Sequence, residues 1–161
     1  MKWFLHVSIA LLLFILSGCA VKKEITRSEA YVITIKNKQI ALSDTGFINH
    51  GNAYDSVQIF SAGNLLFHLE VMGNYVCMDG KCLDRLAFNQ NFFQAEHYAE
   101  LMQDIMAQKP IYDGKFLRQT PQGFEQELIF ETSHILYKVE NVHSSFKDTQ
   151  NGILIRLKRL P

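Results

Sequence analysis

The chain has 161 residues, 48% of them hydrophobic, and its 16 lysines and arginines equal its 16 aspartates and glutamates in number. A chain of this length can form one domain with a sizeable core. Because it has no basic excess, it is not expected to hold the phosphate backbone of a nucleic acid.

The first eighteen residues have the organisation of an export signal. Lys2 supplies a positive start, and the run from Phe4 to Leu16 is almost wholly apolar, interrupted only by His6 and Ser8. This run is shorter than the roughly 20 apolar residues that a transmembrane helix needs, and no later run is longer. Residues 1–18 are therefore predicted to be a cleaved signal peptide.

The signal ends in Leu16-Ser17-Gly18-Cys19, which is the pattern of a lipobox. Such a cysteine receives a diacylglyceryl group before cleavage, so Cys19 is predicted to carry the lipid that anchors the protein to a membrane. Ala20 follows, where an aspartate would favour inner-membrane retention in similar lipoproteins, and this points to the outer membrane. The alternative is an uncleaved anchor with an incidental cysteine.

Cleavage before Cys19 would leave 143 residues, predicted to form a polar tether over 19–30 and one β-rich domain over 31–161. Lys2 is lost with the signal, so 15 basic residues face 16 acidic ones and the net charge is −1. The expected protein is a monomer that faces the periplasm, with the lipid on Cys19 as its only attached group.

Cys77 and Cys82 flank Asp79-Gly80, a pair typical of a two-residue hairpin turn. In such a hairpin Met78 pairs with Lys81, and the two cysteines lie opposite each other at a non-hydrogen-bonded site. A cross-strand disulfide is the favoured interpretation. Free thiols and metal or redox chemistry are the alternatives, although no Cys-His cluster supplies further zinc ligands.

Short segments of alternating polarity, separated by turn residues, predict an antiparallel sheet with one wet face. Together with the cysteine hairpin they make about eight strands in meander order, and even spacing favours an incomplete β-barrel or curved sheet. The segments are Tyr31–Ile35, Gln39–Leu42, Ser56–Phe60, Leu65–Met72, Phe124–Phe130, His134–Val142 and Ile153–Leu160.

One covering helix is predicted over Phe92–Gln108, with Asn91 at its start and Pro110 beyond its end. A single apolar stripe recurs along it at helical spacing. This stripe either lines a hollow interior or packs a dry core. The sequence does not distinguish the two, because filled and hollow barrels show the same alternation of polar and apolar residues. It consists of Tyr98, Leu101, Met102, Ile105 and Met106.

No catalytic arrangement stands out in the sequence, and the protein is not expected to be an enzyme. Ser133-His134 and His143-Ser144 place serine beside histidine, but neighbours on a strand point to opposite faces. There is no Gly-x-Ser-x-Gly elbow, and the histidines lack ligand spacing, so no metal site is expected.

The order of these parts resembles the LolA/LolB lipoprotein-carrier family, and LolB in particular because of the lipobox. The resemblance covers about Asp55 to Pro110, with weaker support to the C-terminus. The two cysteines of the hairpin Tyr75–Leu83 are no part of the family pattern. The parts that match are the strand pair Ser56–Ser61 and Leu65–Met72, Gly73-Asn74, the hairpin Tyr75–Leu83, the helix Phe92–Gln108, the turn with Pro121 and Gly123, and the strand with Ile153, Ile155 and Leu157.

The resemblance implies an unclosed antiparallel barrel with a helical lid, whose apolar cavity takes the acyl chains of lipoproteins handed over by a periplasmic carrier. The lid would be the apolar stripe, and Leu65 would be the membrane-contacting residue of a protruding loop, although the loop tip is small and polar. The alternative function is a scaffold lipoprotein that holds another envelope protein and has no catalytic activity.

Overall fold

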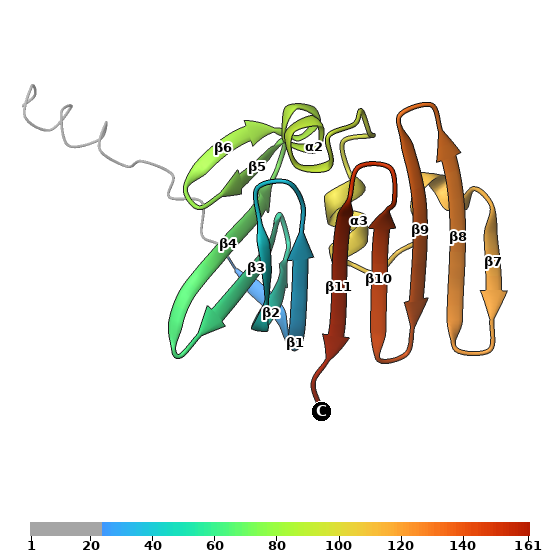
Figure 1. The fold of residues 1–161 in the computed structure, drawn as a ribbon. Coiled ribbons are helices and arrows are strands. Elements are labelled where there is room, and N and C mark those ends of the chain that lie inside the picture. The colour runs from blue at the N-terminus through green and yellow to red at the C-terminus, as the bar shows by residue number, and fades with distance from the viewer. Residues whose placement is uncertain (1–23) are drawn as a thin grey trace, which may run out of the picture.

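The structure, a computed structural model, describes residues 24–161. Eleven antiparallel strands form one open sheet in the order β6-β5-β4-β3-β2-β1-β11-β10-β9-β8-β7 (Figure 1). The strands are β1 (Ile25–Lys36), β2 (Ala41–Gly51), β3 (Tyr54–Ser61), β4 (Asn64–Met72), β5 (Tyr75–Met78), β6 (Lys81–Asp84), β7 (Leu117–Thr120), β8 (Gly123–Phe130), β9 (Ser133–Glu140), β10 (His143–Asp148) and β11 (Ile153–Arg159).

The chain order explains why helices cover the sheet. β6 and β7 are consecutive strands, yet they form the two opposite edges. The connection between them must cross the sheet, and it does so through α2 (Arg85–Phe93), α3 (Leu101–Met106) and the 3₁₀ turn η1 (Tyr112–Gly114). We call residues 85–114 the cover. In Figure 1, α2 lies beside β5 and β6, and α3 lies behind β10 and β11.

The mainly β fold with an open antiparallel sheet is confirmed, but the expected count of about eight strands was too low. β7 and β10 were missed because their alternation is short and rich in polar residues. β2 is also longer than expected, since Gly46 lies within it and not in a turn. A Cβ atom on Gly46 would lie 2.1 Å from the Gln58 carbonyl oxygen, so this glycine permits a close strand approach.

The sheet begins earlier than the sequence suggested. Residues 25–30 were assigned to the tether, but they lie in β1 and pair with the end of β2, where Ala30 is opposite Phe47. The pairing is antiparallel and is held by backbone hydrogen bonds. The side chains of this segment are mostly polar, so their sequence pattern did not predict a strand. Cys19, the predicted lipidation site, and the predicted signal peptide over residues 1–18 lie outside the described residues.

The single helix expected over Phe92–Gln108 was wrong. Two shorter helices replace it, because Gln94 adopts a left-handed conformation (φ 60°, ψ 22°) that ends α2. α2 also begins earlier than expected: the side chain of Asp84, and not that of Asn91, caps it by accepting a 2.9 Å hydrogen bond from the Ala87 backbone N–H. Tyr98 consequently precedes α3 and does not share its helix.

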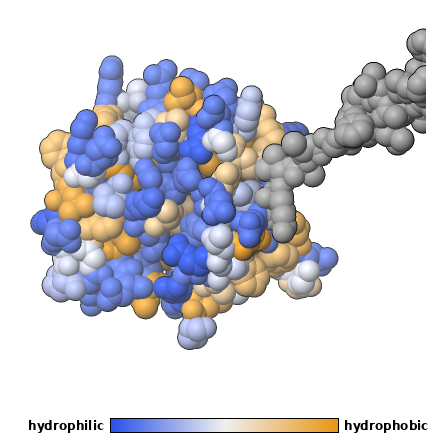
Figure 2. All heavy atoms as spheres, turned by 180° about the vertical axis from the view of Figure 1, so that it is seen from behind, coloured by the Kyte–Doolittle hydropathy of each residue, from blue (hydrophilic) through white to orange (hydrophobic). Residues whose placement is uncertain are grey.

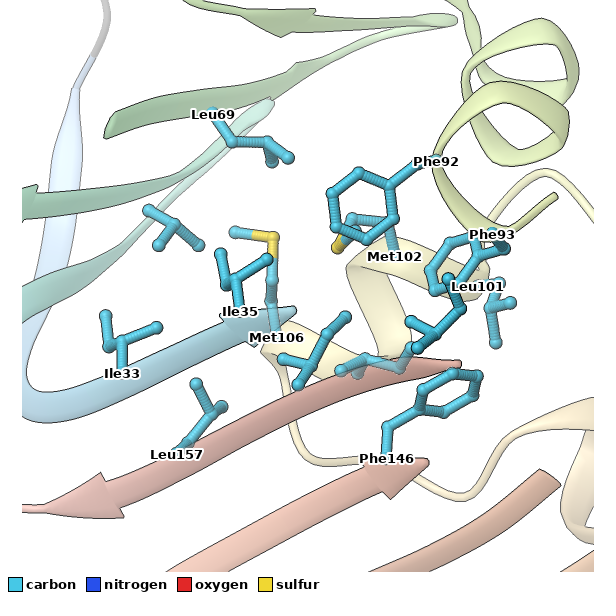
Figure 3. Close-up of a cluster of buried hydrophobic side chains, with 14 of the residues drawn as sticks. Ile33, Ile35, Leu69, Phe92, Phe93, Leu101, Met102, Met106, Phe146 and Leu157 are labelled. Atoms are coloured by element: carbon cyan, nitrogen blue, oxygen red, sulfur yellow. The ribbon is translucent and has the colours of Figure 1, made fainter. Parts of the chain in front are cut away.

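A single apolar core lies between the sheet and the cover. Side chains of β1, β3, β4, β10 and β11 point towards α2 and α3, and Figure 3 shows Ile33, Ile35 and Leu157 of the sheet facing Met106 of α3. Alternate residues along each strand supply this face, as in a sheet with one buried side. No helix within residues 24–161 is long and apolar enough to cross a membrane.

Candidate functional site: the apolar space beneath the cover

The four apolar residues of α3 all enter the core. Leu101, Met102, Ile105 and Met106 are 4% exposed or less. Their spacing places them on one side of the short helix, which faces the sheet. Tyr98, the fifth residue of the predicted stripe, is half-buried at the rim, where its hydroxyl donates a 2.8 Å hydrogen bond to Asp104 Oδ2.

The phenylalanines of α2 complete the underside of the cover, and none of them was among the predicted lid residues. Phe88 stacks on Phe92 with ring centroids 5.3 Å apart, and Phe92 meets Phe93 edge-on at 5.0 Å. Phe93 in turn meets Phe146 of β10 at 5.4 Å. Such pairs favour a fixed geometry beyond their buried area.

In this structure the protein's own side chains fill the space beneath the cover. The buried residues of the core cluster are at most 5% exposed. A cavity wide enough for an acyl chain would leave accessible surface on its lining, so the observed state has no such vacancy. Any apolar guest must therefore replace cover side chains.

Several polar groups tie the cover to the sheet. Near α3 they are Gln103 and Gln108, and Gln108 Nε2 donates to the Tyr31 hydroxyl of β1 at 3.0 Å. Gln103 Nε2 donates to Asp55 Oδ2 of β3 at 2.6 Å, while its Oε1 accepts from Arg85 Nη1 at 2.9 Å. Asp55 also pairs with His50 of β2 at 2.7 Å. Burial raises the pKa of Asp55, but the hydrogen bonds from His50 and Gln103 outweigh it and lower the pKa. Asp55 is therefore ionised at neutral pH.

The C-terminal end of the cover is fixed by the buried Gln126 of β8. Its side chain makes a pair of 2.9 Å hydrogen bonds with the backbone N–H and carbonyl of Ile111, and a further one of 2.8 Å to the Lys115 carbonyl. These bonds satisfy both the side-chain amide and the connecting backbone. The cover is thus hydrogen-bonded to the sheet at both places, near η1 through Gln126 and around α3 through Gln103 and Gln108.

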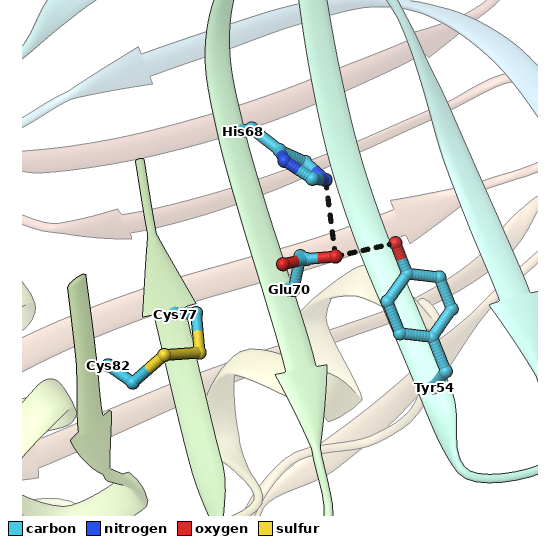
Figure 4. Close-up of a disulfide and its surroundings, with 5 residues drawn as sticks. All are labelled: Tyr54, His68, Glu70, Cys77 and Cys82. Atoms are coloured by element: carbon cyan, nitrogen blue, oxygen red, sulfur yellow. Dashed lines mark hydrogen bonds and ion pairs between the residues drawn. A yellow bond between two sulfur atoms is a disulfide. The ribbon is translucent and has the colours of Figure 1, made fainter. Parts of the chain in front are cut away.

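The disulfide predicted from the hairpin is present. Cys77 and Cys82 lie directly opposite in the β5–β6 register, with Cα atoms 3.9 Å apart, and Asp79 and Gly80 occupy the turn with positive φ. Figure 4 places it beside β4, where Glu70 accepts a hydrogen bond from Tyr54 and lies 3.6 Å from His68. The bridge fixes the hairpin from which α2 starts.

Leu65 lies near the tip of the β3–β4 hairpin and is 49% exposed. The sequence analysis missed its apolar neighbours: Leu66 is 55% exposed, and Phe47 contacts Phe60 edge-on at 6.1 Å. A register shift beside Phe60 leaves the consecutive Leu65 and Leu66 both exposed, which strict alternation would not predict. In Figure 1 this hairpin projects beyond the neighbouring strands.

The serine and histidine neighbours do not form a nucleophile with its base. The Ser133 hydroxyl donates to Asp148 at 2.7 Å, whereas His134 turns to Glu127 at 2.8 Å. His143 pairs with Glu140 on the surface. Within residues 24–161, no group of three His, Cys, Asp or Glu residues is arranged to hold a metal ion.

Polar and apolar residues are intermixed over the face of the molecule opposite to that of Figure 1 (Figure 2). Comparison of the chain with known proteins found no matching family model and no significantly similar curated protein.

Proposed function

We propose that the protein is a lipid-anchored envelope lipoprotein that takes up acyl chains of other lipoproteins beneath the cover and helps deliver them to the outer membrane. Cys19 would hold it on the membrane, and the apolar sheet face would receive the guest. Two features support this function: the lipobox that ends in Cys19, and the open sheet whose apolar face lies under a helical cover.

One observation carries the proposal: the apolar core lies between a sheet and a separable connection. The cover contributes two helices of 9 and 6 residues, and its middle is held to the sheet by apolar packing and by the side-chain hydrogen bonds of Gln103 to Asp55 and of Gln108 to Tyr31. Helices this short have little stability apart from their packing. The cover can therefore move without breaking a sheet ladder.

Physically, uptake is an exchange of one apolar partner for another. Lifting α3 exposes Met102 and Met106, and an acyl chain then covers the same sheet surface at about 25 cal/mol for each Å² removed from water. Methionine side chains adapt to a guest of variable shape because they are unbranched and flexible. Because the guest replaces existing contacts, the net affinity stays moderate and release remains possible.

A fluorescent fatty-acid probe titrated into the purified protein tests this directly. Saturable binding is expected, with competition by unlabelled fatty acid. The absence of saturable binding would refute the carrier proposal.

Gln103→Ala tests whether the cover must move. The change removes the hydrogen bonds to Asp55 and Arg85, so the cover should open more readily and the association rate of the probe should rise several-fold. The free energy of unfolding should fall by about 1–3 kcal/mol. Gln119→Ala on exposed β7 is the matched control. Equal association rates for Gln103→Ala and the control would contradict a moving cover.

A specific observation also favours the scaffold alternative. The outer face of β7–β10 carries an open hollow of about 850 Å³ with exposed Phe116, Ile129 and Leu136 among charged side chains. Exposed apolar residues framed by charges are typical of protein-binding surfaces. A Phe116→Ala, Ile129→Ser variant that binds the acyl probe normally but loses a crosslinked partner would support the scaffold function. Unchanged crosslinking would count against it.

A further inference from the structure

A second pocket, which we call the rim pocket, lies outside the apolar core. It has a volume of about 890 Å³ and is formed by the segment between α2 and α3, η1 and the β8–β9 turn. Its volume falls in the range of small-molecule sites. The residues that matter for its chemistry are Glu96, His97, Tyr98, Tyr112, Phe130 and Glu131.

Three aromatic rings form a continuous wall of the rim pocket. Tyr112 lies at the centre, with its ring centroid 4.8 Å from that of Tyr98 and 4.9 Å from that of Phe130. Phe130 is 39% exposed, so part of its ring is accessible to a ligand in the pocket. Aromatic faces carry negative charge density and attract cations.

The charged groups of the pocket have one sign. Glu96 and Glu131 are exposed and line it, whereas no lysine or arginine is among the lining residues; Lys38 lies at its edge, where its Nζ donates to the lining residue Gln94 at 3.5 Å. Neither carboxylate takes part in an ion pair within residues 24–161. An anionic ligand would be repelled here, whereas a cation would meet two carboxylates and an aromatic wall.

His97 supports this wall from beneath. It is 7% exposed, and its Nδ1 lies 2.6 Å from the Tyr112 hydroxyl. Burial lowers the pKa of His97 and raises that of Tyr112 to about 12, so both are neutral near pH 7 and the hydroxyl donates. His97 therefore adds no positive charge. Its Nε2 is buried without a hydrogen-bond partner among the described residues.

The backbone beneath the aromatic wall is strained. Tyr112 and Asp113 adopt φ of 50° and 54°, a region that residues with a Cβ rarely occupy in succession. The bonds of Gln126 to Ile111 and of His97 to Tyr112 hold this turn in place. Strain that the surroundings enforce is characteristic of binding sites whose side chains are positioned in advance.

We propose that the rim pocket binds an organic ammonium cation, with Tyr112 and Phe130 contacting its methyl or methylene groups and Glu96 and Glu131 supplying the countercharge. The cation can be a free amine or the headgroup of a membrane lipid, since both present the same chemistry. The pocket lies at the rim of the cover and outside the apolar core, and the proposal does not require acyl uptake.

The test uses choline and its neutral isostere 3,3-dimethyl-1-butanol, each titrated into the purified full-length protein and followed by NMR shifts of the pocket residues. Choline should bind roughly tenfold or more tightly than the isostere, because only choline gains the cation–π and ionic contacts. Equal binding of both compounds, or no saturable shift with choline, would overturn the proposal.

Two variants and a control locate the effect. Phe130→Leu and Glu131→Gln should each weaken choline binding several-fold, while Glu100→Gln, an exposed acid outside the pocket, should leave it unchanged. Melting curves establish that the variants fold. If choline binds every variant with wild-type affinity, the assigned site is wrong.

Competition experiments with lipid vesicles distinguish a lipid headgroup from a free amine as the ligand of the rim pocket. Phosphatidylcholine vesicles that compete with choline at the same residues assign a lipid headgroup, and vesicles that do not compete assign a free amine. The acyl-probe titration is read separately, so failure of choline binding and failure of acyl uptake are distinguishable.

Discussion

At the scale of single residues, Asp148 shows how a buried charge is retained. It is fully buried and accepts hydrogen bonds from Ser133 Oγ and Asn151 Nδ2, both at 2.7 Å, and from backbone N–H groups that include those of His134 and Gln150. Burial by itself raises the pKa of this carboxyl, but the donors outweigh it and lower the pKa. The carboxylate thereby organises the turn between β10 and β11.

Asp148→Asn should lower the free energy of unfolding at pH 7 by about 2 kcal/mol, because an amide NH₂ would face donors. A lowered folded-state pKa gives stability that is present above the unfolded pKa of about 3.9 and is lost as pH falls through the folded value. Urea unfolding between pH 7 and acid should show this loss in the wild type and a weaker one in the variant. Exposed Asp113→Asn is the control, and an identical pH profile for Asp148→Asn and wild type would contradict this role.

At the scale of elements, the start of α2 depends on its cap. Asp84→Ala removes the acceptor for the Ala87 N–H and should lower the free energy of unfolding by about 1 kcal/mol. Asp84→Asn keeps a capping oxygen and serves as the matched control. Urea unfolding measures both, and an alanine variant as stable as the asparagine variant would show that the disulfide hairpin alone positions the helix.

At the scale of the whole molecule, the β3–β4 tip is the candidate membrane contact. Leu65→Asp combined with Leu66→Asp should reduce the affinity for anionic vesicles, measured by cosedimentation, at least about a hundredfold, since each leucine that enters the bilayer contributes about 1.5–3 kcal/mol. The measurement uses a Cys19→Ala protein so that the lipid does not mask the contact. Leu86→Asp is the control, because Leu86 is equally exposed on α2, away from this tip in Figure 1. Equal losses for both variants would refute a specific contact.

The tether restricts how this tip meets a membrane. Glu24 lies against Gly51, just before β3, whereas the tip follows Ser61 at the other end of that strand. The five residues from Cys19 to Glu24 span at most about 18 Å, and β3 extends about 26 Å. If Cys19 carries the proposed lipid, the tip can contact the same membrane only when β3 and β4 are tilted away from the upright orientation.

Local patterns were sufficient for several features. Alternation in Leu65–Met72 and Ile153–Leu160 predicted strands, and Asp79-Gly80 predicted the hairpin that brings Cys77 opposite Cys82. These predictions succeeded because a strand face and a two-residue turn depend on residues that are neighbours in sequence. The burial of Leu101, Met102, Ile105 and Met106 follows for the same reason.

Other features depended on distant partners. The break at Gln94 and the strand conformation of Gly46 arise from packing against other parts of the chain, which no helical or alternating period records. The rim pocket was missed because Tyr112 and Phe130 come from separate segments. The sequence around His97 does not predict a site, since the role of His97 depends on Tyr112, fifteen residues away.

The sequence by itself determined a mainly antiparallel β domain, its disulfide hairpin and an apolar helical stripe that needs a covering partner. The tertiary structure decided that the stripe is held within a filled core, that two helices share the cover, and that the edges of the sheet are β6 and β7. The physical reason is that local periodicity fixes which face of a segment is apolar. By contrast, the pairing of β1 with β11 and the path of the cover across the sheet depend on contacts between residues that are distant in sequence.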